Sequence, residues 1–223
     1  MTYYCIMVAN LFSRLQQDLS RLIGDRLGIL HQMRGFRVVV DNTRSDIATA
    51  DVVQRLDESL ALIEQYQPWR LAHLRRDLDH IRVVRYACRG AYFPDQRACM
   101  VELTFLARRD IGAATVASTI VHEGMHARTA ALGARLRALG LRRSDSMPTA
   151  ESREPRAESR SREERICRRA ELEFGESLPA DIGAPVVQRA LESLALDDAD
   201  VAPAIDWNLA QRRIADVDRG SRG

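Results

Sequence analysis

The chain has 223 residues, of which 46% are hydrophobic, 29% charged and 5% aromatic, and its formal net charge is only +2. These values favour one soluble globular domain over residues 1–223 and exclude an intrinsically disordered chain, which would carry fewer apolar residues and a larger net charge. No apolar run approaches the roughly 20 residues of a membrane-spanning helix, so stable membrane insertion is not expected. All 33 basic residues are arginine, and the 31 acidic residues that balance them favour ion pairing over binding to a nucleic acid.

The cysteines and the N-terminal residues favour a cytoplasmic location. The four cysteines stand far apart, with no CxxC pair and no spacing typical of a disulfide framework. The first residues lack the basic region of a signal peptide, and Asn10 interrupts their apolar stretch. A reducing compartment is therefore expected.

Residues 1–80 are predicted to form a mostly helical N-terminal part. Apolar residues recur at helical spacing over 11–27 and again over 51–65, and Pro68 is placed to start a further helix. Between the first two helices, the β-branched segment 36–40 predicts a short strand.

Residues 81–180 contain the strand-rich part of the chain. Alternating apolar and charged side chains predict a strand over 81–86. A hairpin is expected from a strand at 91–93, a turn, and a second strand over 98–106.

A helix and a polar segment follow the predicted hairpin. Asp110 is an N-cap candidate for a helix over 111–132, and Gly133 is expected to end it. Residues 142–162 contain two prolines, many serines and almost no apolar residues. We expect this segment to be a mobile loop, because it cannot bury enough apolar surface to offset the entropy lost on ordering.

Helical periodicity resumes at Ile166 and is expected to end near Gly175. Residues 181–223 are then predicted to form C-terminal helices over 186–196 and 205–214, followed by a polar tail.

The most informative residues are His122, Glu123 and His126, which form the pattern HExxH inside a predicted helix. Helical positions four apart lie on the same face, so both imidazoles can reach one metal ion. Glu123 is rotated from His122 by about 100°, which places it beside the metal, free to hold a water molecule. The pattern predicts a catalytic zinc site with Glu123 as the general base. The alternative is a helix whose two histidines only satisfy hydrogen bonds.

A third protein ligand is expected from the acidic helix that follows the polar segment. Glu164 and Glu171 fall on one side of that helix, at the margin of an apolar stripe that includes Cys167. Glu163 lies nearer the middle of the stripe, and Cys167 is expected to be a small core residue. By position alone, each of the three carboxylates could bind the metal or form a surface ion pair with an arginine.

Two segments of the chain resemble a known family. The run STIVHEGMHART and the later run ERICRRAELEFGESLP resemble the gluzincin branch of zinc metallopeptidases. They are also similar to a set of uncharacterised bacterial proteins that pair a helical HExxHA with a later E-x-x-C-x-x-x-E-x-x-F-x-x-x-LP segment. The resemblance covers mainly residues 91–179 and implies that His122, His126 and Glu164 bind Zn²⁺, with Glu171 as a second recurrent acid. The long Arg/Ser segment departs from the well-studied gluzincins, and their oxyanion-stabilising Tyr or His has no identifiable counterpart.

The resemblance implies a helix-rich, zincin-like α+β fold. In such a fold a small β-sheet packs on the active-site helix, the third ligand comes from a following helix, and an edge strand, here expected at 98–106, pairs with an extended substrate. The implied activity is zinc-dependent hydrolysis of a peptide or protein substrate, with Glu123 moving the proton of the attacking water. Two other interpretations stay open: a zinc-binding protein whose metal is structural, and an arginine-rich interaction protein in which HExxH is incidental. No residue pattern indicates the oligomeric state.

Overall fold

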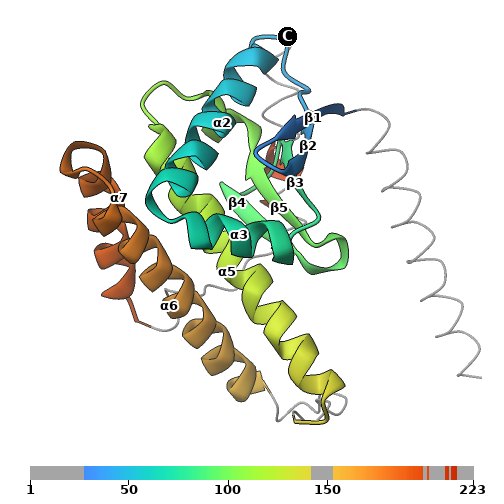
Figure 1. Ribbon diagram of the computed structural model, residues 1–223, viewed down its shortest axis with the longest axis vertical. Coiled ribbons are helices and arrows are strands. Elements are labelled where there is room, and N and C mark those ends of the chain that lie inside the picture. Colours follow the sequence, from blue (N-terminus) through green and yellow to red (C-terminus); the bar gives the residue numbers. More distant parts are fainter. Residues whose placement is uncertain (1–27, 142–152, 198–199, 201–208, 211, 215–223) are drawn as a thin grey trace, which may run out of the picture.

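The computed structural model describes residues 28–141, 153–197, 200, 209–210 and 212–214. The elements in chain order are β1 (Ile29–Met33), β2 (Phe36–Asp41), α2 (Thr49–Tyr66), α3 (Pro68–Asp77), β3 (His80–Val84), β4 (Gly90–Phe93), η1 (Pro94–Gln96), β5 (Ala98–Glu102), α4 (Leu103–Ala107), α5 (Ala113–Ala138), α6 (Arg153–Ser177) and α7 (Ala180–Leu194). The fold is therefore α+β and helix-rich, with one small sheet (Figure 1). The helix expected over 11–27 lies outside the described residues, and of the one expected over 205–214 the described residues 209–210 and 212–214 are helical.

The five strands form a mixed sheet in the order β1-β2-β3-β5-β4. Strands β2, β3 and β5 run parallel, while β1 and β4 pair antiparallel at the two edges. The predicted strands at 36–40 and 81–86 are confirmed as β2 and β3, and the predicted hairpin is confirmed by the pairing of Phe93 with Ala98. The expectation that 98–106 forms an edge strand is wrong, because β5 has β3 on one side and β4 on the other.

The strand expected over 98–106 also ends earlier than its alternation suggests. The Glu102 carboxylate accepts a hydrogen bond from the backbone N–H of Phe105 at 2.7 Å and caps the short helix α4. Leu103 and Phe105 remain buried, so the apolar pattern is satisfied by a helical turn instead of a strand.

Helices α2, α3 and α5 pack against one face of the sheet. Alternate strand residues such as Val38, Ile81 and Val101 belong to one buried apolar cluster with residues of these helices. The predicted helix over 51–65 and the helix start at Pro68 are confirmed as α2 and α3. Among the described helices, none combines the length and the apolar composition needed to cross a bilayer.

Helix α5, which carries HExxH, is longer than predicted. Its N-cap is Gly112 instead of Asp110, which pairs with Arg108. The helix passes Gly133 and ends at Ala138, with Leu139 as its C-cap and Gly140 directly after, at a φ of +68°. The N–H groups of Gly140 and Leu141 bond back to the carbonyls of Arg137 and Leu136, both at 3.0 Å. This pair of bonds is the Schellman arrangement that closes many helices.

The prediction of a loop over 142–162 is wrong for its second half, because α6 begins at Arg153. Pro155 stands in the first turn of α6, where its missing N–H has no helical partner to lose. Arginine, glutamate and alanine dominate the turns that follow, and all three favour helix. Residues 142–152 lie outside the described residues. Helix α6 runs alongside α5 (Figure 1). Its glutamates contact the two histidines of α5.

Candidate metal centre

His122 and His126 lie one turn apart on one face of α5, as their spacing predicted, and both rings contact Glu164 of α6. The two Nε2 atoms are 3.2 Å apart, and the ring centroids are separated by 5.0 Å. His122 is buried and His126 is partly buried. The two imidazoles therefore present their Nε2 atoms to one point in the protein interior.

Glu164 of α6 reaches that same point. Its two carboxylate oxygens lie 3.2 Å from Nε2 of His122 and 3.3 Å from Nε2 of His126. Zinc holds nitrogen and oxygen ligands at about 2.0–2.2 Å, which separates neighbouring ligand atoms of a tetrahedral site by about 3.3–3.6 Å. Each oxygen of Glu164 approaches a different histidine, and the observed separations are close to that spacing, so these three side chains could hold one metal ion.

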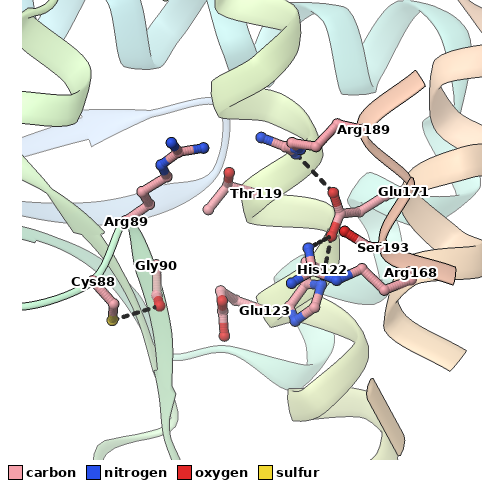
Figure 2. A pocket seen from close by; sticks show the side chains of 10 residues that line it. All are labelled: Cys88, Arg89, Gly90, Thr119, His122, Glu123, Arg168, Glu171, Arg189 and Ser193. Carbon is pink, nitrogen blue, oxygen red and sulfur yellow. Dashed lines mark hydrogen bonds and ion pairs between the residues drawn. The ribbon is translucent and has the colours of Figure 1, made fainter. Parts of the chain in front are cut away.

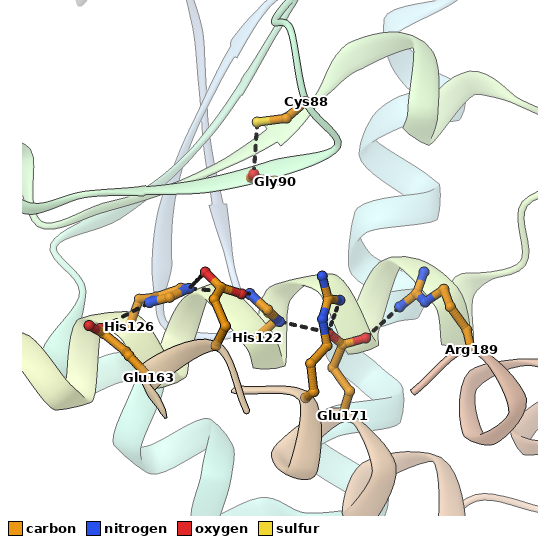
Figure 3. Close-up of polar contacts among 9 residues, drawn as sticks. Cys88, Gly90, His122, His126, Glu163, Glu171 and Arg189 are labelled. Atoms are coloured by element: carbon orange, nitrogen blue, oxygen red, sulfur yellow. Dashed lines mark hydrogen bonds and ion pairs between the residues drawn. The ribbon is translucent and has the colours of Figure 1, made fainter. Parts of the chain in front are cut away.

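Glu163 and Glu171 occupy different positions around the two rings. Oε1 of Glu163 lies 3.0 Å from Nδ1 of His126, and Oε1 of Glu171 lies 2.6 Å from Nδ1 of His122 (Figure 3). Each histidine thus has a carboxylate on Nδ1, which fixes its ring and leaves Nε2 for a metal. Among the three candidate carboxylates, Glu164 is the one placed between the Nε2 atoms.

Cys167 was expected to be a core residue, and the structure adds a second property. It is fully buried, and its sulfur lies within 4.8 Å of ligand atoms of both His122 and His126, so these three residues form a group that could hold a metal ion. Burial raises the pKa of the Cys167 thiol, against the opposing effect of a hydrogen bond with His126. Its position three residues after Glu164 is the signal that could have identified it from the sequence.

Glu171 is held in place by two arginines besides His122. Oε1 accepts from Arg168 of α6 at 2.6 Å, and Oε2 accepts from Arg189 of α7 at 2.7 Å. The side chain is only 1% exposed. Burial would raise the pKa of Glu171, but the hydrogen bond to His122 and the charges of both arginines lower it to about 2. This carboxylate is therefore ionised and rigidly oriented when it positions His122.

Glu123 is buried and faces a cavity of about 350 Å³ that His122 also lines. Burial raises the pKa of the Glu123 carboxyl above its ordinary value, against the opposing effect of the nearby His122 and His126. A carboxylate whose pKa moves toward neutrality is better suited to accept and return a proton. The cavity is lined by Cys88, Arg89, Gly90, Thr119, His122, Glu123, Arg168, Glu171, Arg189 and Ser193 (Figure 2).

Strand β4 forms the wall of the cavity opposite α5. Gly90 lies so close to α5 that a Cβ atom there would be 2.5 Å from Cγ2 of Thr119 and 3.0 Å from Oε1 of Glu123. The edge strand that borders the site is therefore β4, and no local sequence pattern pointed to Gly90.

Comparison with protein-family models, with curated proteins and with solved structures found no match to this chain. What the protein does must therefore be inferred from the chemistry of its own residues.

Proposed function

We propose that the protein is a zinc-dependent hydrolase of the metallopeptidase type, with a zincin-like fold and a peptide or protein substrate. His122, His126 and Glu164 are the proposed ligands, and Glu123 is the proposed general base. The observation that carries the proposal is the convergence of two Nε2 atoms and one carboxylate at separations of 3.2–3.3 Å. We also propose a cytoplasmic location. The free thiols of Cys88, Cys99 and Cys167 agree with a reducing compartment.

In the proposed reaction, zinc activates the water and the carbonyl, and three glutamates transfer the proton or orient the metal ligands. Zinc at such a site supplies a Lewis acid that polarises a carbonyl and lowers the pKa of a water molecule to about 7. Glu123 accepts a proton from the attacking water at a carboxylate oxygen and delivers it to the leaving amine nitrogen. Glu171 and Glu163 hold the two imidazole rings in the orientation that presents Nε2.

A second candidate function is a zinc-binding protein whose metal is structural. It is favoured by Cys167, because four protein ligands would close the site and leave no position for water. In that case the metal would only join α5 to α6. No contact among the residues that the structure describes favours the third interpretation, an arginine-rich interaction protein.

Metal content tests the proposed ligands. The protein purified without added metal should contain about one equivalent of zinc, which His122→Ala and Glu164→Gln should each remove. His73→Ala and Glu176→Gln are matched controls, because His73 meets the ring of Trp69 edge to face and Glu176 is exposed near the end of α6. If Cys167→Ala loses zinc while Glu164→Gln keeps it, the third ligand is Cys167 and not Glu164. A protein that never binds zinc would refute the proposal.

Turnover separates the two candidate functions. Glu123→Gln should keep its zinc and lose hydrolysis of a mixed peptide pool by about 100-fold or more, because general-base catalysis contributes about that much. Wild-type turnover in this variant would contradict the role of Glu123. Zinc binding by the wild type without any hydrolysis would favour the structural site.

A further inference from the structure

The cavity beside Glu123 carries more positive than negative charge. Three guanidinium groups line it, from Arg89, Arg168 and Arg189, against the two carboxylates of Glu123 and Glu171. A hydrolytic site needs only the metal ligands and a base for its chemistry, so three arginines on one cavity call for a separate explanation. Clustered guanidinium groups attract an anionic group of a ligand.

Two of the three arginines are held in place before any ligand arrives. Arg168 and Arg189 each donate to Glu171, and Arg189 also donates to Oγ of Ser118 at 2.7 Å. A guanidinium carries five N–H donors, so these bonds leave further donors on both groups. The single charge of Glu171 is shared among two arginines and His122, which leaves positive charge in excess.

Arg89 differs from the other two because no acidic side chain among the described residues pairs with it. It is exposed, and its described side-chain contact is with the ring of Phe105, whose centroid lies 5.6 Å from the guanidinium carbon. Figure 2 shows the guanidinium groups of Arg89 and Arg189 pointing toward one another from opposite walls of the cavity, near Thr119. Like charges that face each other across a cavity repel, and an anion between them offsets this repulsion by attracting both.

We propose that this cavity binds a carboxylate of the substrate between Arg89 and Arg189, next to the bond that is hydrolysed. This inference rests on the proposed function and specifies its substrate class: peptides with a carboxylate near the scissile bond. The carboxylate is either the C-terminal one or that of an acidic side chain. The guanidinium fork matches the planar carboxylate in shape and charge.

Three short peptides test the proposal: N-acetyl-tetra-alanine, its C-terminal amide, and the amide in which glutamate replaces the last alanine. Their dissociation constants are measured by calorimetry on the Glu123→Gln protein, and their kcat/KM on the wild type. The first or the third peptide should bind about tenfold or more tightly than the neutral amide, because hydrogen bonds between ionised groups are the stronger ones. The favoured peptide tells which source supplies the carboxylate.

The variant Arg89→Gln should lose this preference, and Arg169→Gln, at an exposed position outside the cavity lining, should keep it. Equal or absent binding of all three peptides, or a preference that survives Arg89→Gln, would overturn the proposal. Hydrolysis without a preference would leave the proposed function standing and refute only the carboxylate site. A preference in binding without any hydrolysis would support the carboxylate site and refute the hydrolase.

Discussion

Gly90 shows how a residue without a side chain can shape the catalytic geometry. Because a Cβ at Gly90 would lie 2.5 Å from Cγ2 of Thr119 and 3.0 Å from Oε1 of Glu123, the variant Gly90→Ala has to displace β4 or the side chains of Thr119 and Glu123. We expect a fall in kcat of about tenfold or more with unchanged zinc content, because small misplacements of a catalytic group are costly. Gly112→Ala is the control, since nothing lies within 4 Å of a Cβ there. Wild-type kcat in Gly90→Ala would contradict the placement of Glu123.

The sequence predicts the role of a site residue only where that role depends on neighbours in the same helix. His122 and His126 share a face on any helix, so their convergence follows from the sequence alone. The choice among the glutamates does not, because Glu163 and Glu164 differ by about 100° around α6 and either can face α5. The packing of α6 on α5 decides it, by placing Glu164 between the Nε2 atoms and Glu163 on Nδ1 of His126.

At the scale of elements, the contact between α6 and α7 depends on two glycines. A Cβ at Gly183 of α7 would lie 2.4 Å from the carbonyl oxygen of Gly175 of α6. This obstacle is backbone and cannot rotate away, so Gly183→Ala must push the helices apart. We expect a loss of about 2–3 kcal/mol in the free energy of unfolding, measured by urea denaturation. The Gly112→Ala control should lose less than about 1 kcal/mol, because only a capping preference changes. An equal effect in both variants would contradict the close helix contact.

Elements were predicted well where one periodicity runs without interruption, as in α2 and α3. They were predicted poorly where a single contact overrides the pattern. Glu102 captures the N–H of Phe105 and converts the end of a strand into α4, and strand β1, which was not predicted, is defined by its pairing with β2. Both contacts are local, since Glu102 and Phe105 are three residues apart and β1 joins β2 through the turn at Arg34 and Gly35, but the periodicity of apolar side chains does not reveal them.

At the scale of the whole molecule, the candidate site lies where α5, β4, α6 and α7 meet. On the sheet side, Leu74 of α3 packs directly against α5 at Gly124. A Cβ atom at Gly124 would lie 2.1 Å from Cδ2 of Leu74. On its other side α5 meets α6, which is in turn packed on α7 and held to it by Arg165. The cavity arginines Arg89 and Arg189 come from opposite sides of this arrangement and are far apart in the chain. No sequence pattern could therefore have brought them together.

The X-ray absorption spectrum at the zinc edge tests the proposed ligands His122, His126 and Glu164 most directly. The measurement uses the full chain loaded with one equivalent of zinc. The spectrum should show only nitrogen and oxygen scatterers at about 2.0–2.2 Å, with the outer-shell signature of two imidazoles from His122 and His126. A sulfur scatterer at about 2.3 Å would place Cys167 in the ligand set, and a spectrum without imidazole scattering would contradict the metal centre itself.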